Sequence, residues 1–415
     1  MKLIVDETGE PSPCLRGETM SLRFVYGRAG CGKTRCCPNE INGAEGRLIF
    51  IVPEQYSFQA EKDLISVLDR GGIIKTEVLS FRRMAYRIFN EAGGITVPHI
   101  HPAGKCMILY HLLDKFREKL MIFSRSAERE GFVNTLATLI TEFKRYRVTP
   151  GHLQQASGEL RENTALSEKL SELDLIYSEF EKTLSERYRD SDDDLTLAAR
   201  KLSQCRIYDG AEIWIDGFAS FTPQEYGLIG ELLKQAARIT VTFCTDSLGT
   251  RSKSDETDIF RATKRAYKKL VGIAEENKIR LEPPVLIKGE PPVRFRTSPE
   301  LAHLERNYYA WPYRTYDHKT ESLRLFSSVS VFPEVEETAR SIIRLCRDRG
   351  MRFRDIAVVT RDLESYEKII EVVFTEYGIP FFIDRKVDIM NHPLIRLVVS
   401  MLDIFIENWS YESVF

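Results

Sequence analysis

The order of apolar and polar positions predicts an α/β protein. Short runs of consecutive apolar residues are typical of parallel strands buried on both faces. Residues 57–71 and 82–92, on either side of the third such run, have the apolar spacing of helices. The strand-like runs are LRFVYG (22–27), GRLIFIVP (46–53), KTEVLS (75–80), AEIWIDGF (211–218) and RITVTFCTD (238–246). The pattern therefore predicts one parallel sheet made from two stretches of chain, 20–102 and 205–320.

A helical block interrupts this sheet. Between residues 103 and 204 no strand-like alternation is convincing, and apolar side chains recur at helical spacing. One run steps strictly by four and three residues, as in a coiled coil: Leu166, Leu170, Leu173, Tyr177, Phe180 and Leu184. We therefore expect residues 103–204 to form an all-helical insertion that includes a short antiparallel coiled pair.

A second α/β unit is expected over residues 321–398, after a Pro-rich segment. The pattern reads strand (322–330), helix (334–348), strand (355–361), helix (363–376) and strand (379–384). The chain then becomes helical, so residues 399–415 are expected to begin a further helical insertion. At the other end, residues 1–19 are polar with Pro and Gly and predict a disordered tail.

Composition narrows the class of protein. The chain has 415 residues, 43% of them hydrophobic and 29% charged, which is ordinary for a globular protein of two or three domains. No run of about 18 apolar residues occurs, so we expect no membrane span and no signal peptide. The eight cysteines lack CxxC spacing and are interpreted as reduced thiols of a cytoplasmic protein. The net charge of -2 neither supports nor excludes DNA.

Residues 27–34, GRAGCGKT, match the phosphate-loop pattern GxxxxGK[ST] between a predicted strand and a predicted helix. In such a loop, backbone N–H groups surround phosphate oxygens, a lysine neutralises the β- and γ-phosphates, and a Ser or Thr hydroxyl binds magnesium. We expect ATP with Mg²⁺ to bind here, with a glycine-rich structural turn as the alternative. The expected nucleotide-binding residues are Gly27, Arg28, Ala29, Gly30, Cys31, Gly32, Lys33 and Thr34, with Thr34 as a magnesium ligand.

A second carboxylate is needed to hold magnesium, and ATP hydrolysis usually also needs an adjacent Glu. Asp216 follows the apolar run of EIWIDGF and is the expected magnesium ligand, with a simple strand cap as the alternative. The next residue is Gly217, so the usual base is missing. Glu225 lies nine residues further on, where a solvated helix position is the favoured interpretation. Pro38 is expected to end or kink the helix after the loop.

Polar and aromatic residues follow the second and third predicted strands, at the sheet edge where α/β ligands bind. They combine phosphate contacts with base stacking, as a single-stranded DNA track requires. The residues are Gln55, Tyr56, Ser80, Phe81, Arg82 and Arg83. The alternative, in which the aromatics pack between helices and the arginines are solvated, is equally weighted. The basic segments FKRYR (143–147) and KRAYKK (264–269) are interpreted first as solvated helix faces.

In the second unit, Arg361 follows the run IAVVT. It is a candidate arginine finger, that is, an arginine that contacts the γ-phosphate of a nucleotide bound on the first unit. A surface salt bridge is the equal alternative.

Several segments together resemble the N-terminal part of the AddB family, the helicase/nuclease B subunits of bacterial AddAB complexes, related to RecB-like and UvrD-like superfamily 1 helicases. They are GRAGCGKT, IFIVPEQYSF, VLSFRRMAYRIFNEAGG, LITEFKRYRVTP, IWIDGFASFTPQEY, SPELAHLERNYY and DIAVVTRDLESY, with YGIPFFID and HPLIRLVVSML after them. The resemblance covers residues 21–410, which correspond to roughly the first third of a family member. Several motifs in the right order make it far more specific than the phosphate loop alone.

The resemblance implies a P-loop NTPase with two RecA-like lobes, the first interrupted by the helical insertion and the second incomplete here. It places the family's nuclease, with its iron–sulfur cysteines, beyond residue 415, so none of the eight cysteines is expected to be a cluster ligand. It also implies a degenerate motor that holds DNA and recognises a recombination hotspot while an AddA-like partner drives translocation. Two departures from active relatives bear on this: no Gln precedes Gly27, and the motor's last motif would lie beyond residue 415.

Three functional hypotheses follow. The first is an ATP-binding, DNA-binding helicase-like region that acts in double-strand break repair and recombination with an AddA-like partner, away from membranes. The second is an autonomous DNA-dependent ATPase or helicase with an unidentified base. The third is a structural module that binds a partner and leaves its phosphate loop unused.

Overall fold

The computed structural model describes residues 20–411 apart from 69–75, 95–96, 128, 130, 161–163, 186, 250–256, 290 and 385–388. The chain divides into two compact units, one reaching to Ser322 and one beginning at Leu323. The predicted tail, residues 1–19, lies outside the described residues. Within the described part of the chain, no helix has the length and apolar character needed to span a membrane.

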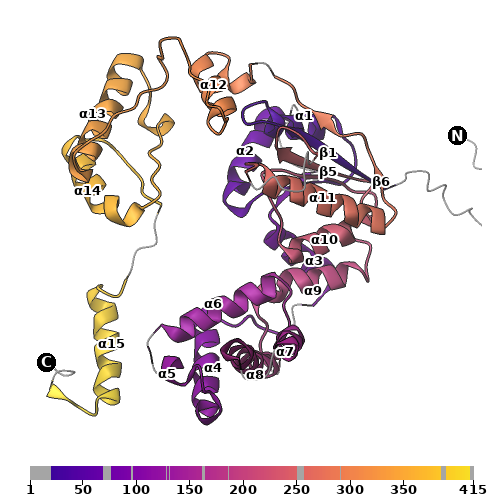
Figure 1. The fold of residues 1–415 in the computed structure, drawn as a ribbon, viewed down its shortest axis with the longest axis vertical. Helices are drawn as coiled ribbons and strands as arrows, with labels where there is room; N and C mark the ends of the chain where they lie inside the picture. The colour runs from indigo at the N-terminus through magenta and orange to yellow at the C-terminus, as the bar shows by residue number, and fades with distance from the viewer. Residues whose placement is uncertain are drawn as a thin grey trace, which may run out of the picture. The chain divides into compact units, whose positions relative to one another are not determined.

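The first unit is built on a parallel sheet of seven strands (Figure 1). The strands are β1 (Ser21–Gly27), β2 (Leu48–Ile51), β3 (Thr76–Leu79), β4 (Glu212–Ile215), β5 (Arg238–Cys244), β6 (Arg280–Leu281) and β7 (Val285–Leu286). Their order is β3-β2-β4-β5-β1-β6, with β7 also paired to β1. This confirms the predicted α/β class with a parallel sheet. The short β6 and β7 lie in the Pro-rich segment, where no strand was predicted.

Helices cover both faces of the sheet (Figure 1). On one face α1 (Lys33–Gly43) and α2 (Ser57–Val67) pack on alternate side chains of the strands, among them Phe50 and Trp214. The other face is covered by α3 (Phe81–Ala92), α9 (Asp194–Leu202), α10 (Pro223–Leu233) and α11 (Arg261–Glu276). The sequence interpretation placed 194–202 in the helical insertion. That placement is wrong for α9, because Ala198, Ala199 and Leu202 are buried in the core of the sheet.

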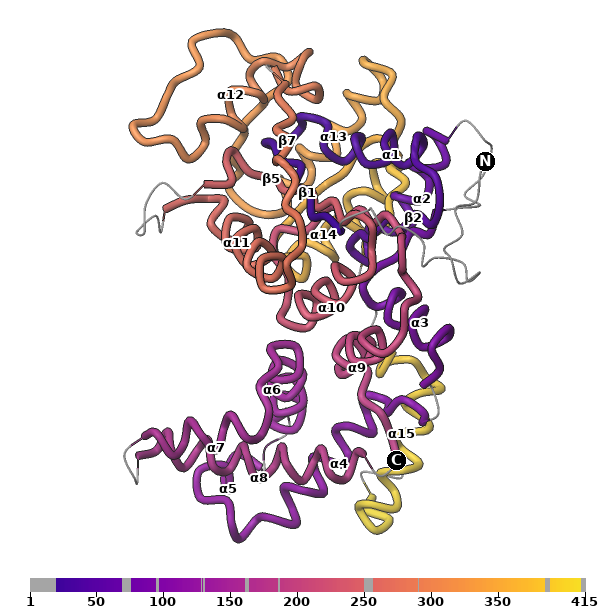
Figure 2. The backbone as a smooth tube through the Cα atoms, turned by 90° about the vertical axis from the view of Figure 1, so that its right-hand side faces the viewer, coloured from indigo at the N-terminus to yellow at the C-terminus, as the bar shows by residue number. Residues whose placement is uncertain are grey.

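Between α3 and α9 the described residues form five helices with a core of their own (Figure 2). They are α4 (Pro102–Lys115), α5 (Ser124–Ala127), α6 (Phe132–Arg145), α7 (Pro150–Glu159) and α8 (Ala165–Ser185). The predicted apolar run faces this core from Leu173 to Leu184, whereas Leu166 is exposed at the start of α8. α7 packs along α8, and α4 packs against α6 and α8.

The second unit contains α13 (Val331–Arg349), α14 (Leu363–Glu376) and α15 (Pro393–Ile406). Helices are present at the two predicted positions within the unit and also near the C-terminus, where the chain was expected to become helical. The three predicted strands at 322–330, 355–361 and 379–384 are not formed in the part that the structure describes. A strand needs hydrogen-bonded neighbours, and these segments leave Leu325, Val359 and Phe382 almost fully exposed. An apolar run indicates a segment that tends to be buried, but it does not show whether a neighbouring strand is present to pair with it.

Candidate functional site

The phosphate-loop motif forms the turn between β1 and α1. Gly30 and Gly32 have positive φ angles of 76° and 103°, a backbone conformation that strains other residues. At Gly27 a Cβ atom would lie 2.7 Å from Cys31 Sγ and 2.8 Å from Ile287 O, so only glycine fits. The first turn of α1 begins at Gly32, whose carbonyl accepts the N–H groups of Arg35 and Cys36 at 3.1 Å. The loop therefore ends at a helix N-terminus, the usual place for a bound phosphate.

The two side chains expected to contact phosphate and magnesium differ in their surroundings. Lys33 Nζ donates a 2.8 Å hydrogen bond to the carbonyl of Arg28, so its ammonium group lies against the loop itself. Thr34 is exposed in the first turn of α1. Pro38 was predicted to end or kink this helix. It does not end it, since α1 continues to Gly43 with Pro38 buried inside it. Proline there removes only one backbone donor, and burial of its ring together with Cys37 and Ile41 retains the helix.

Asp216 lies directly after β4, two strands away from the loop at the same edge of the sheet. Its carboxylate is buried and accepts the hydroxyl of Thr242 from β5. No Lys or Arg of the described residues forms an ion pair with it. The charge of Asp216 contributes to the raised pKa of Cys37, although burial of the thiol is the larger cause. The effect on Cys37 indicates that the Asp216 carboxylate lies close to the first turns of α1. A magnesium ion on a nucleotide bound at the loop would need a carboxylate ligand there.

The residue after Asp216 explains why no glutamate follows. Gly217 has φ 87°, and a Cβ atom there would lie 3.0 Å from Cδ of Pro53. Both the backbone conformation and the limited space therefore disfavour a side chain at this position. Glu225 does not replace the missing base, because its carboxylate accepts the N–H of Thr222 at 2.7 Å and caps α10. Burial raises the pKa of Glu225 above its ordinary value.

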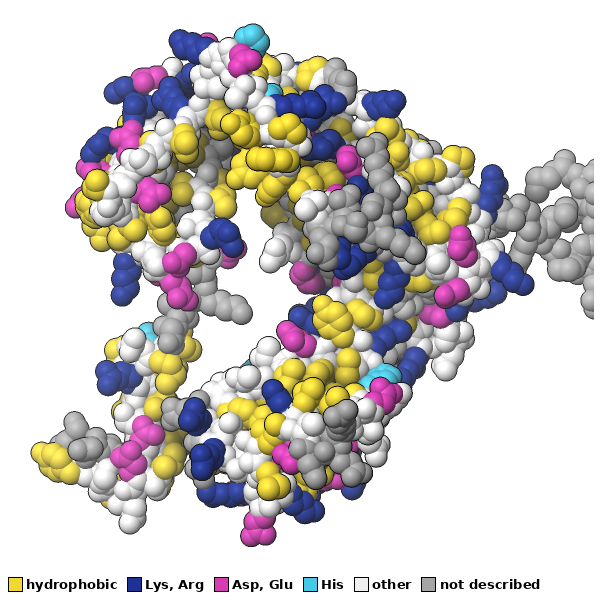
Figure 3. All heavy atoms as spheres, viewed as in Figure 1, with side chains coloured by type: hydrophobic (Ala, Val, Ile, Leu, Met, Phe, Trp, Pro, Cys, Tyr) yellow, Lys and Arg dark blue, Asp and Glu magenta, His cyan; other side chains and the backbone are white. Residues whose placement is uncertain are grey.

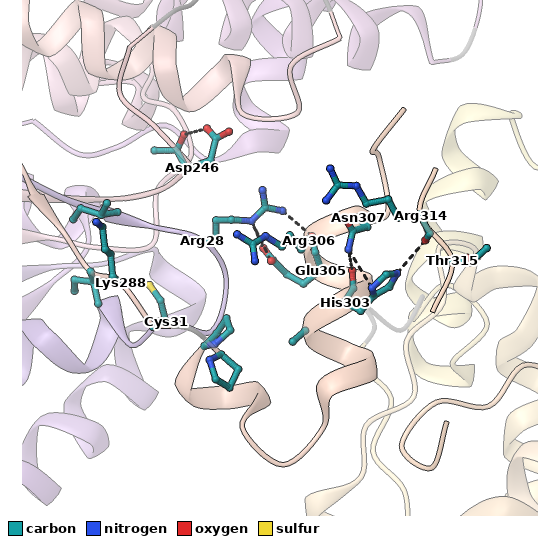
Figure 4. Close-up of a pocket in the computed structure, with 17 residues that line it drawn as sticks. Arg28, Cys31, Asp246, Lys288, His303, Glu305, Arg306, Asn307, Arg314 and Thr315 are labelled. Atoms are coloured by element: carbon teal, nitrogen blue, oxygen red, sulfur yellow. Dashed lines mark hydrogen bonds and ion pairs between the residues drawn. The ribbon is translucent and has the colours of Figure 1, made fainter. Parts of the chain in front are cut away.

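A cavity of about 1090 Å³ opens beside the phosphate loop (Figure 4). It lies between the loop, the segment after β7 and α12 (Pro299–Asn307). Arg28 joins two of these walls: its Nε lies 3.1 Å from both carboxylate oxygens of Glu305, and Nη2 donates to the Glu305 carbonyl at 2.7 Å. The sequence interpretation missed Glu305, since 277 residues separate it from Arg28 and no local pattern marks the contact.

The proposed DNA track is only partly exposed. Gln55, Arg82 and Arg83 are exposed, and Arg83 Nη1 lies 3.2 Å from Glu61. Ser80 is buried as the cap of α3 and donates to Glu54 at 2.8 Å.

The two aromatic residues of the proposed track are less available than the arginines. Tyr56 is half-buried, and its hydroxyl donates to Asp63 at 2.7 Å. Phe81 is buried in the core against Phe218, with ring centroids 5.3 Å apart. Phe81 is therefore a packing residue, and its predicted use as a stacking platform is corrected: a base would reach it only if the ring left the core.

The remaining predicted residue, Arg361, belongs to the second unit and is exposed just before α14. Among the residues that the structure describes, no group of three or more His, Cys, Asp or Glu is arranged to hold a metal ion. A pair of oxygen ligands such as Thr34 and Asp216 instead suits magnesium that arrives with phosphate, since Mg²⁺ keeps several waters and few protein ligands.

Comparison with known proteins identifies the family. The family described as "ADDB, N-terminal" matches residues 24–305. Three proteins, each named as the B subunit of an ATP-dependent helicase/deoxyribonuclease, are similar to 95% of this chain: that of Acetivibrio thermocellus at 63% identity, that of Ruminiclostridium cellulolyticum at 53% and that of Clostridium botulinum at 47%. The chain spans 35% of the length of each. The chain therefore belongs to the AddB family of helicase/deoxyribonuclease B subunits.

Proposed function

We propose that this chain is the nucleotide-binding and DNA-binding, helicase-like region of a cytoplasmic AddB-type subunit that acts with an AddA-like partner in double-strand break repair and recombination. In this proposal it holds ATP and Mg²⁺ and hydrolyses ATP poorly. The observation that carries it is the pairing of a formed phosphate loop with Asp216 followed by Gly217. A site of this kind retains the groups that bind and lacks the group that activates water.

Each residue of the site has a distinct task in this proposal. The N–H groups of the loop and of the first turn of α1 hold the phosphate oxygens. Lys33 would give up its hydrogen bond to the Arg28 carbonyl and contact the β- and γ-phosphates instead. Thr34 and Asp216 would hold the magnesium ion. The ion neutralises charge on the phosphates when it is bound. Arg361 is proposed as a further γ-phosphate contact, and Gln55, Arg82 and Arg83 as DNA contacts at the sheet edge.

The test of nucleotide binding is Lys33→Ala. Loss of one charge-assisted contact, worth about 1.5–3 kcal/mol, should weaken binding of a fluorescent ATP analogue by about 10- to 150-fold. Lys234→Ala is the matched control, since Lys234 pairs with Glu231 at the exposed end of α10. Equal affinity of the Lys33→Ala variant and the unchanged chain would leave only a structural module with an unused loop.

Turnover separates the remaining hypotheses. With DNA present, we expect ATP hydrolysis by the unchanged chain to stay below about 1 per second, the lower end for active enzymes. Faster DNA-stimulated turnover would instead identify an autonomous ATPase or helicase.

A further inference from the structure

An exposed aromatic segment follows α12, and two of its residues, Arg314 and Thr315, line the cavity beside the phosphate loop. We propose that residues 308–316, the aromatic segment, form a stacking platform for single-stranded nucleic acid. Its sequence is YYAWPYRTY, with five aromatic residues and one Arg among nine, and no Leu, Ile, Val or Met. The fractions exposed are 69% for Tyr308, 72% for Tyr309, 89% for Trp311 and 75% for Tyr313. So many exposed aromatic rings together are uncommon at a surface without a ligand.

Hydrogen bonds attach the backbone of the segment, and of the chain that follows it, to α12. Glu300 on α12 accepts the N–H groups of Glu321 and Ser322 at 3.0 and 2.6 Å. His303 on the same helix bonds the carbonyl of Arg314 at 3.0 Å. Within the segment, the rings of Tyr308 and Tyr309 meet edge to face with centroids 4.8 Å apart. The exposed rings therefore belong to a closed loop anchored on α12.

Charge around the segment favours a polyanion. Between residues 306 and 319, Arg306, Arg314 and Lys319 are accompanied by a single acid, Asp317. Arg306 and Arg314 also line the cavity beside the phosphate loop (Figure 4). The nearest acids of that cavity are already paired, Glu305 with Arg28 and Asp246 with Lys264. Hydrophobic, basic, histidine and acidic side chains lie together at the surface near α12 (Figure 3).

This chemistry matches single-stranded nucleic acid better than a protein partner. Unpaired bases offer flat faces to Trp and Tyr, and their phosphates need cations at intervals along the same path. A protein-binding face would also use aliphatic side chains, and such residues are concentrated elsewhere, on the exposed side of α15. The segment is tied to the phosphate loop through Glu305 and Arg28, so nucleotide and strand would contact the same helix. The inference rests on the DNA binding of the proposed function and adds a site apart from Gln55, Arg82 and Arg83. Loss of nucleic-acid binding in variants of the segment tests this site, whereas ATP binding by Lys33→Ala tests the nucleotide site.

The experiment measures binding of fluorescein-labelled dT20 to the 415-residue chain by anisotropy. Trp311→Leu and Tyr309→Leu should each weaken binding by about 5- to 150-fold, the loss expected for one stacked base. Tyr110→Leu is the matched control, because Tyr110 is an aromatic residue of similar exposure on α4; its affinity should equal that of the unchanged chain. Unchanged thermal unfolding of all three variants would exclude misfolding as the cause.

Two further readouts report stacking and charge separately. The chain has three Trp residues, of which Trp214 is buried, so in a Trp409→Phe background dT20 should quench the emission of Trp311. Arg314→Gln should reduce the slope of log affinity against log salt by about 0.7, the value of one phosphate contact. The proposal is overturned if Trp311→Leu and Tyr309→Leu bind dT20 as tightly as Tyr110→Leu. It is equally overturned if these variants change only self-association in sedimentation, which would make the segment a protein contact.

Discussion

At the scale of single residues, Gly217 decides what the site can do. Any side chain there meets both the positive φ of 87° and the ring of Pro53. Gly217→Glu, the change that would supply the missing carboxylate, should therefore lower the free energy of unfolding by about 1–3 kcal/mol. Urea denaturation measures this loss. Gly272→Ala is the matched control: nothing lies within 4 Å of the Cβ position in α11, so this variant should gain up to about 1 kcal/mol. A Gly217→Glu variant as stable as the unchanged chain would contradict the argument.

Cys36, two residues after Thr34, should react slowly with alkylating reagents. Burial and the neighbouring Glu40 carboxylate raise the pKa of its thiol from 9.0 to about 11. Only the thiolate reacts, so at pH 8 about one molecule in a thousand is reactive at this position. We expect iodoacetamide to label exposed Cys244 faster than Cys36 at pH 8, and labelling of Cys36 to rise steeply as the pH approaches 11. Peptide mass mapping measures both rates.

Glu40→Gln provides the control for this pKa. It removes the charge that disfavours the thiolate, so the pKa of Cys36 should fall and its labelling at pH 8 should become faster. If Cys36 in the unchanged chain is labelled as fast as Cys244 at pH 8, the thiol is not shielded as the structure indicates.

At the scale of elements, the Arg28–Glu305 pair joins the phosphate loop to α12. The two side chains are 27% and 17% exposed, so solvent screens the pair only in part. Glu305→Gln should weaken this attachment by about 1 kcal/mol, which corresponds to about fivefold faster amide exchange in residues 299–307. Hydrogen–deuterium exchange measured by peptide provides the test.

Glu231→Gln is the matched control, because Glu231 pairs with Lys234 at the end of α10, away from the loop and α12. Exchange in 299–307 should not change in that variant. Equal exchange of α12 in the Glu305→Gln variant and the unchanged chain would show that other contacts hold the helix.

Comparison of the predicted and observed elements shows which of them local sequence patterns were sufficient to predict. Strands β1 to β5 and the loop after β1 follow from local apolar runs and glycine spacing, whereas the two-residue strands β6 and β7 do not. The position of Asp216 after β4 could be predicted because a carboxylate at the end of an apolar run is a local signal, and its magnesium role stays a prediction. The effect of Pro38 could not be predicted locally, because the free-energy cost of a proline in a helix depends on how α1 packs. The three unformed strands were predicted wrongly because strand pairing depends on distant segments. Phe81 and Glu305 likewise depend on tertiary contacts that no short pattern contains.

At the scale of the whole first unit, a buried charge network joins the helical insertion to the sheet. Lys144 on α6 lies 2.6 Å from Asp193 and 3.1 Å from Asp190, and Lys105 on α4 lies 2.9 Å from Asp190. These acids precede α9, which packs on the sheet. Lys144→Met should therefore lower the free energy of unfolding by about 3–5 kcal/mol, because it leaves buried carboxylates without their counterion. Lys115→Met is the control, since Lys115 pairs with Glu179 at an exposed position.

The pH dependence of that loss distinguishes charge from packing. Burial opposes ionisation of Asp190, but Lys144 and Lys105 outweigh it and hold its pKa below the ordinary value. Asp190 thus stabilises the unchanged chain above about pH 4, and this contribution is lost as the pH falls through the lowered pKa. Without Lys144 the pKa of Asp190 should rise. Protonation of Asp190 on acidification then removes the buried unpaired charge and reduces the loss of stability of the Lys144→Met variant. The stability gap between the two chains, measured by urea denaturation from pH 7 to pH 4, should narrow; a gap that stays constant would mean that Lys144 acts through the packing of its alkyl chain alone.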